Sequence, residues 1–309
     1  PDANVVTILD GIREIAGSAK VNYYNYGDDV RQNSMDKVNE AAAIAKKSDL
    51  AIVVVGENPL RYQKSKTCGE NIDRMGLDLL GTQNQLVQKI HETGVPTIVV
   101  LVGGRPLSVN WIAQNVQALV QAWEPGSLGG RALANILAGK VNPSAKLPIS
   151  IPRHSGQIQM IYNHKPSQYF HKYIDGPSTP LYPFGFGLSY TRFAYSSLKL
   201  SHTRISDKDS FTASIELTNV GDREGTEVVQ LYIRDIYSSA TRPVKELKDF
   251  ARVTLKPGEK KTVTFTVTPD KLAYWNRNMQ YGVEKGEFEI MIGSSSQDKD
   301  LKKVKMEVL

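Results

Sequence analysis

The sequence contains almost no cysteine and no long hydrophobic run. Its single cysteine, Cys68, excludes a disulfide within the 309 residues, so cysteine usage does not indicate the compartment. The densest apolar runs, residues 50–55 and 96–102, are far shorter than the roughly 18 residues that a membrane-spanning helix needs. The chain opens on Pro1 with neither a basic nor an apolar leader, so we expect no signal peptide within it and no membrane partner. A mature secreted protein would look the same.

Charge of one sign is not concentrated anywhere in the chain. Lys and Arg number 38 and Asp and Glu 32, which gives a net charge of +6, and the basic residues are scattered. This pattern favours an ordinary hydrated surface over nucleic-acid binding. Hydrophobic residues make up 40% and charged residues 23%, which excludes a disordered chain, a collagen and a disulfide miniprotein. The length is about twice that of a typical domain and predicts two domains.

The first half alternates helical and strand patterns. Two continuous apolar runs end at glycines and are typical of strands buried on both faces of a parallel sheet: residues 50–55 and 97–102. Weaker strand patterns lie at residues 20–26, 118–122 and 146–151, and helical spacing at residues 5–15, 35–47, 83–92 and 128–138. This alternation predicts a mostly parallel sheet with helices on both faces. Because the pattern opens with a helix, we expect a first strand to precede it in a longer parent chain.

The second half changes to a β pattern after an irregular stretch. Residues 152–196 are rich in Pro, Tyr, His and Gly, and we expect Phe184, Phe186 and Tyr190 to bury against the first domain. Alternating segments separated by turns then predict a sandwich of immunoglobulin or fibronectin type, with strands at residues 211–218, 227–234, 262–268 and, closing the series, 286–293. The predicted fold class is therefore α/β followed by all-β. The predicted domains are an α/β domain at 1–175, an aromatic connector at 176–196 and a β-sandwich at 197–309.

The loop after residue 55 is the strongest candidate for chemistry. Ligands bind beyond the carboxyl ends of strands in open α/β sheets, and loops longer than roughly 12–15 residues are often functional. This one runs to residue 80 and gathers the acids Glu57, Glu70, Asp73 and Asp78 with the bases Arg61, Lys64, Lys66 and Arg74. A hydrated loop with weak ion pairs fits the spacing equally well. A carboxylic acid in a cleft can serve as general acid, and glycoside hydrolysis uses two carboxyl groups.

Other candidate sites are weaker. No His or Cys cluster accompanies the acids, so we expect no metal and no other cofactor. The glycines at 126–130 lack a complete phosphate-binding motif and are more typical of close strand–helix packing. Residues 103–106 end a strand and could line the same cleft as the acid loop, but a plain turn fits them equally well. Cys68 has no nearby His and is a poor candidate nucleophile. His154, His164 and His171 have no metal-binding spacing, and we interpret them as loop residues.

Motifs along nearly the whole chain carry a family resemblance. They include Gly69-Glu-Asn-Ile-Asp-Arg74, Ala122-Trp-Glu-Pro-Gly-Ser-Leu-Gly-Gly130, Tyr182-Pro-Phe-Gly-Phe-Gly-Leu-Ser-Tyr190 and Arg242-Pro-Val-Lys-Glu-Leu247. With these motifs the chain resembles the C-terminal portion of glycoside hydrolase family 3, the β-glucosidase and β-xylosidase family. It is most similar to the bacterial periplasmic β-glucosidases. One departure is Leu80, which stands before Gly81 where the family usually has proline; it does not touch Glu70.

The resemblance implies an architecture and roles for residues. An N-terminal (β/α)8 barrel, absent from these residues, would carry the nucleophilic aspartate and most sugar contacts. An α/β sandwich and a fibronectin type III-like domain would follow it. The α/β sandwich would contribute the acid/base glutamate, which by motif position is Glu70. Glu57 is the runner-up and looks more like a structural member of the motif, while Asp73 and Arg74 would hold the shape of the loop.

The activity implied is that of a retaining exo-β-glycosidase, of which this chain is the C-terminal part. Its partners would be a β-linked oligosaccharide or glycoside and the barrel, in cis or as a second fragment. The implied location is periplasmic or extracellular, and we expect the isolated chain to be inactive. Two alternatives remain open. One is a non-catalytic carbohydrate-binding or scaffold protein that retains only the accessory domains. The other is a nucleotide-binding α/β protein with an appended sandwich.

Overall fold

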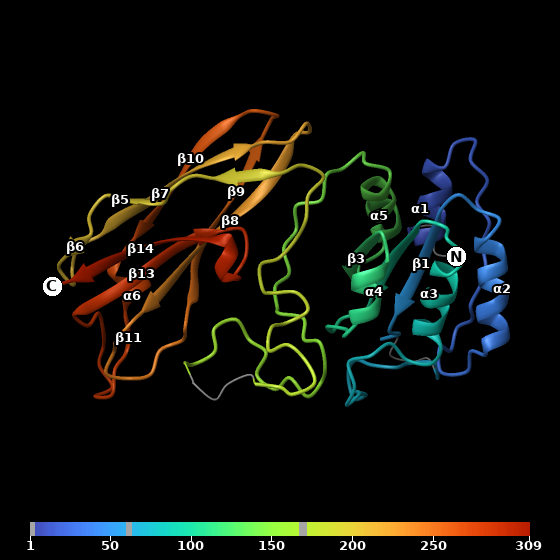
Figure 1. Cartoon of the computed structure of the whole chain (residues 1–309), viewed down its shortest axis with the longest axis horizontal. Coiled ribbons are helices and arrows are strands. Elements are labelled where there is room, and N and C mark those ends of the chain that lie inside the picture. The colour runs from blue at the N-terminus through green and yellow to red at the C-terminus, as the bar shows by residue number, and fades with distance from the viewer. Residues whose placement is uncertain (1–3, 60–63, 167–171) are drawn as a thin grey trace. The chain divides into compact units, whose positions relative to one another are not determined.

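A computed structural model describes residues 4–59, 64–166 and 172–309, and its contacts divide the chain into two units (Figure 1). The first unit comprises Pro1–Val141 and Pro152–Ile158, and the second comprises Asn142–Ile151 and Gln159–Leu309. The division by contacts therefore lies earlier than the boundary at residue 175 that the sequence suggested. Hydrogen bonds explain part of this difference, since Leu247 N donates to Tyr162 Oη and Val244 N to His164 O.

The first unit is built on a three-stranded parallel sheet in the order β1 (Ala51–Gly56), β2 (Thr97–Val102), β3 (Ala118–Trp123). Val53 and Val55 of β1 are buried, and so are Val99, Val100 and Leu101 of β2. The parallel sheet is confirmed. Only β2 is buried on both faces as the continuous apolar runs predicted, because Val54 of β1 is 43% exposed. The helices are α1 (Ile8–Ile15), α2 (Met35–Ala45), α3 (Gln83–His91), α4 (Asn110–Asn115) and α5 (Gly129–Leu137).

Helix packing in this unit follows from small residues and a cap. α3 packs on β1 and β2, and α1 packs on α5. The α1–α5 contact is close because a Cβ at Gly11 would lie 2.2 Å from Gly130 O, and one at Gly130 would lie 2.0 Å from Thr7 O. Thr7 and Asp10 form a capping box at the start of α1. Gly130, the second residue of α5, thus serves close packing against α1, which is helix–helix contact rather than the strand–helix packing that the sequence indicated.

Two of the expected strands are wrong. Residues 20–26 form no strand, because their alternating side chains turn to helices and loops rather than to a sheet: Tyr24 Oη donates to Glu40 Oε2 at 2.6 Å, and Tyr26 Oη pairs with Thr82. Residues 146–151 contribute one isolated bridge, Ile151 to Tyr182. Their backbone pairs with the connector instead of with β3, since Leu147 N donates to Phe186 O at 2.8 Å.

The second unit is an all-β sandwich. Its larger sheet runs β6-β14-β13-β8-β9 and its smaller one β10-β7-β4, with β5 on β7. A short hairpin joins β11 (Tyr274–Trp275) and β12 (Tyr281–Gly282). The other elements are β4 (Phe193–Tyr195), β5 (Lys199–Leu200), β6 (Arg204–Ile205), β7 (Phe211–Asn219), β8 (Gly225–Asp235), β9 (Glu246–Leu255), β10 (Lys260–Val267), α6 (Pro269–Leu272), β13 (Gly286–Gly293), the 3-10 helix η1 (Asp298–Asp300) and β14 (Leu301–Val308).

The sandwich core comes from the alternation that the sequence displayed. Phe211, Ala213, Ile215 and Leu217 of β7 face inward and meet the inward residues of the larger sheet. One expectation about these strands is wrong. The strand series does not end at β13, because β14 follows and pairs with it along its full length.

The connector does not pack as the sequence suggested either. Phe184 stacks on Tyr162 at 4.2 Å and packs with Tyr232, Met291 and Leu301 of the second unit, while Tyr190 is 42% exposed.

Candidate functional site

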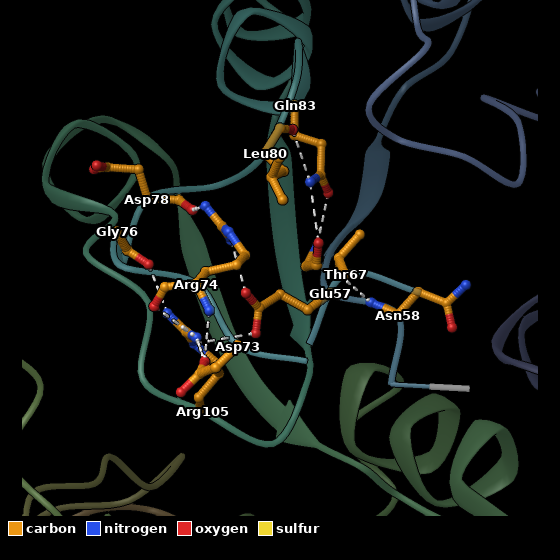
Figure 2. Close-up of polar contacts among 11 residues, drawn as sticks. Glu57, Asn58, Thr67, Asp73, Arg74, Gly76, Asp78, Leu80, Gln83 and Arg105 are labelled. Atoms are coloured by element: carbon orange, nitrogen blue, oxygen red, sulfur yellow. Dashed lines mark hydrogen bonds and ion pairs between the residues drawn. The ribbon is translucent and has the colours of Figure 1, made fainter. Parts of the chain in front are cut away.

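The candidate site begins where β1 and β2 end side by side. Gly56, the last residue of β1, has φ +146°, and a Cβ there would lie 1.8 Å from Val102 O, so only glycine fits. Gln83 at the start of α3 holds this strand end through two hydrogen bonds. Its Oε1 accepts from Gly56 N at 2.7 Å and its Nε2 donates to Gly56 O at 3.0 Å (Figure 2). The residue that follows, Glu57, therefore leaves the sheet in a fixed direction.

Glu57 is enclosed by two guanidinium groups. Its side chain is 0% exposed, and Arg74 Nη1 lies 2.7 Å from Oε1 while Arg105 Nε lies 3.4 Å from Oε2. Figure 2 shows the carboxylate between the two arginines. The thiol of Cys68 lies beside it, and burial and then the hydrogen bond to Glu57 raise the pKa of that thiol to about 11. Glu57 is thus a buried, paired anion, and Cys68 is an inert thiol at neutral pH.

The same two arginines hold the second half of the loop. Arg74 Nη2 donates to Asp78 O at 2.7 Å, and Arg105 Nη2 donates to Gly76 O at 2.5 Å. Arg105 also pairs with the carboxylate of Asp73. Residues 73–78 therefore fold around the buried ion pairs that Glu57 forms with Arg74 and Arg105. This arrangement accounts for the structural roles that the motif suggested for Glu57, Asp73 and Arg74.

Glu70 lies outside that buried core, on an exposed turn. Ile72 N donates to Gly69 O at 3.0 Å, and Asn71 in the third turn position has φ +64°, the signature of a type II turn. Gly69 also has a positive φ, of +101°. Behind the turn, the ammonium of Lys66 donates to Glu70 O. The turn places the side chain of Glu70 at the surface on a constrained backbone.

The structure brings together only some of the loop's charged residues. Glu57, Asp73, Arg74 and Asp78 O form one network, whereas Lys64 is exposed and Arg61 and His171 lie outside the described residues. His154 and His164 lie in loops, as interpreted. Sequence reasoning missed Gln83. It placed residues 103–106 as a possible lining of the same cleft but did not predict the contacts of Arg105 with Glu57 and Asp73. The signal for Arg105 was its place directly after Gly103 and Gly104 at the end of the neighbouring buried strand.

Among the residues that the structure describes, no group of three or more His, Cys, Asp or Glu side chains is placed to hold a metal ion. Within the same ranges, no helix has both the length and the apolar character that crossing a bilayer demands.

Residues 2–190 match the glycosyl hydrolase family 3 C-terminal domain, and residues 227–296 match a fibronectin type III-like domain. The chain belongs to glycosyl hydrolase family 3. A β-xylosidase of Formosa agariphila is 45% identical over 307 residues, which are 98% of this chain and 42% of that protein. The periplasmic β-glucosidase of Salmonella typhimurium is 41% identical over 84% of this chain and 34% of that protein.

Solved structures of two β-glucosidases have the same fold. The β-glucosidase of Listeria innocua in complex with glucose superposes with a TM-score of 0.89 at 31% identity, over 100% of this chain and 42% of that one. A β-glucosidase of Erythrobacter marinus gives the same TM-score at 34% identity, over 100% of this chain and 44% of that one. This family 3 chain therefore spans less than half the length of these relatives, and its fold is that of their C-terminal part.

Proposed function

We propose that this chain is the C-terminal part of a retaining exo-β-glycosidase and that Glu70 is its acid/base. The observation that carries the proposal is the contrast between two glutamates of one loop. Glu57 is fully buried between two arginines, whereas Glu70 is exposed on a turn whose backbone is held in place. Both Arg74 and Arg105 contact the carboxylate of Glu57, and its side chain is 0% exposed, which leaves it no access to a substrate.

Glu70 would act in both halves of the reaction. As an acid it donates its proton to the glycosidic oxygen while the nucleophile of the barrel bonds to the anomeric carbon, and the leaving sugar or alcohol departs. As a carboxylate it then takes a proton from the water that hydrolyses the glycosyl-enzyme. Retaining enzymes place the two carboxyl groups about 5–5.5 Å apart, so the barrel must approach the turn closely.

The substrate class follows from the relatives rather than from this chain. The relatives are β-glucosidases and β-xylosidases, so we propose terminal, non-reducing β-linked glucose or xylose units as substrates. One relative is a periplasmic enzyme, and a periplasmic or extracellular location is proposed on that basis.

The test uses the intact polypeptide that carries these residues together with the barrel. Glu70→Gln should reduce hydrolysis of an alkyl β-glycoside by about 10²- to 10⁴-fold, because that leaving group needs a proton. Cleavage of an aryl glycoside with an acidic phenol should lose far less in its first step. Azide should restore turnover and yield a glycosyl azide, since this anion attacks without a general base.

Asp78→Asn is the matched control, because Asp78 is an exposed acid of the same loop. Asp78→Asn should leave the rates of hydrolysis of both substrates unchanged. If Glu70→Gln hydrolyses alkyl glycosides at the unmodified rate, another residue is the acid.

A further inference from the structure

Lys66 is a buried cation directly beneath the candidate acid. The residue is only 6% exposed, and its ammonium donates a hydrogen bond to the main-chain oxygen of Glu70. Taking an ammonium out of water is costly unless a polar partner replaces the lost hydration. Here that partner is the carbonyl of the residue whose side chain is proposed to transfer the proton.

The base of this lysine is itself fixed. Thr67 N donates to Asn58 O at 2.8 Å, and Asn58 N donates back to Thr67 Oγ1 at 2.9 Å. Asn58 Nδ2 also donates to Ser65 Oγ at 3.0 Å. Lys66, Thr67 and Cys68 are all buried and form an inner layer of the loop. The ammonium therefore reaches the turn from a backbone that is tied to the end of β1.

Two further restraints among the described residues act on other parts of this loop. The Ile72 N to Gly69 O hydrogen bond sets the internal shape of the turn but does not anchor it. Arg105 anchors the loop only from Asp73 onward. Between these anchors, the hydrogen bond from Lys66 fixes the plane of the peptide that joins Glu70 to Asn71, and hence the direction in which the Glu70 side chain leaves the backbone.

We propose that Lys66 is a positioning residue for Glu70, which it holds through the main-chain carbonyl without touching the substrate. This inference rests on the function proposed above. A misplacement of about 1 Å can reduce a rate by roughly 10²-fold, so a pivoting turn should impair proton transfer specifically. Binding of the sugar, which would take place mainly on the barrel, should be much less affected.

The experiment compares Lys66→Met with Lys64→Met in the intact enzyme. Both variants lose one positive charge from the same loop, but Lys64 is exposed and Lys66 is buried. For Lys66→Met, kcat/KM on an alkyl β-glycoside should fall by about 10- to 100-fold, while that on an activated aryl glycoside should fall less than about threefold. Azide should raise turnover of the variant on the activated substrate, as it does for Glu70→Gln. Lys64→Met should show neither effect.

Each outcome decides the matter. If Lys66→Met lowers kcat/KM equally on both substrates, or on neither, and azide has no effect, the inference is wrong. Lys66 would then be a structural residue. If the loss of rate in Glu70→Gln does not depend on the leaving group, the proposed function is wrong, and the inference about Lys66 is wrong as well. If Lys66→Met does not fold, Lys66→Gln keeps a shorter donor at the position. Lys66→Gln should lower kcat/KM on the alkyl glycoside selectively, but by less than Lys66→Met is expected to. If it lowers kcat/KM by the same factor on both substrates, the inference is wrong.

Discussion

At the scale of single residues, the loop after β1 shows how one residue type takes two roles within fourteen positions, from 57 to 70. Glu57 follows the strand immediately, so its direction is set by the sheet and by Gln83, and it points into the arginine pair. Glu70 comes after a buried inner layer, at a turn that needs positive φ at Gly69 and Asn71. Burial and pairing, rather than spacing, separate the structural acid from the proposed catalytic one.

A stability measurement separates the same two residues. Glu57→Gln removes the buried negative charge between Arg74 and Arg105 and leaves both guanidinium groups without it. Because both arginine side chains remain 16% exposed and are partly hydrated, we expect a loss of about 2 to 4 kcal/mol in the free energy of unfolding. Urea titration followed by tryptophan fluorescence would report it, since Trp111 and Trp123 lie in the first unit. Glu70→Gln should change this value by less than about 0.5 kcal/mol, as is usual at exposed positions. Equal losses in the two variants would contradict these roles.

At the scale of elements, a hydrophobic pattern predicted a strand correctly where packing in a sheet was the only cause of that pattern. The apolar run of β2 is buried on both faces, whereas Val54 of β1 is 43% exposed. The predicted and observed bounds of both strands differ by at most one residue. The alternation at residues 20–26 had another cause, since its tyrosines bond to α2 and to Thr82 rather than to a strand.

The contacts around Glu57 could not be predicted from the sequence for a related reason. Arg105 meets Asp73 across 32 positions and Gly76 across 29, and periodicity reports only neighbours along one element. The acid loop could be located from its length and its place after a buried strand, but its partners could not.

The end of β8 carries an acid whose environment predicts a pH dependence. The Asp235 side chain is 4% exposed, and its Oδ2 accepts no hydrogen bond from the described residues, with Arg242 Nη1 3.9 Å away. Burial raises the pKa of Asp235 to about 6; Arg242 opposes this rise, and Glu284 and Glu246 add to it. Since the folded pKa lies above the unfolded value of 3.8, the folded state binds the proton more tightly. The stabilisation by this proton is present at low pH and is lost as the pH rises from about 4 to about 6.

This sign leads to a test with Asp235→Asn. Between pH 4.5 and 7.5, the wild type should lose about 1 to 2 kcal/mol of stability in the second unit relative to the variant, which has no proton to lose. Hydrogen exchange of amides in β8 and β13 within the whole chain gives the opening free energy of this unit at each pH. Asp222→Asn, at an exposed aspartate of the same unit, is the matched control. A parallel pH dependence in wild type and Asp235→Asn would show that Asp235 is ionised throughout this range.

At the scale of the whole molecule, the chain holds the fold of only part of its relatives, 42% of the Formosa enzyme and 34% of the Salmonella enzyme. Within the described acid loop, Glu57 is sequestered by Arg74 and Arg105, and Asp73 is paired with Arg105. Glu57 and Asp73 are thus poor candidates for the nucleophile that a retaining mechanism requires, and we propose that the nucleophile lies in the barrel. The activity of residues 1–309 alone should therefore differ sharply from that of a polypeptide that includes a barrel.

We expect the purified 309-residue chain to hydrolyse neither aryl nor alkyl β-glucosides above the background of its own Glu70→Gln variant. Intact-mass measurement and electrophoresis must accompany the assay, because a co-purifying barrel fragment would supply the nucleophile. If such a fragment is present, activity should follow it through gel filtration and disappear when it is removed. Hydrolysis by the chain alone, at rates near those of complete family 3 enzymes, would mean that the nucleophile lies within these residues. Saturable binding of a β-linked oligosaccharide without hydrolysis, even in the intact polypeptide, would instead favour the carbohydrate-binding alternative.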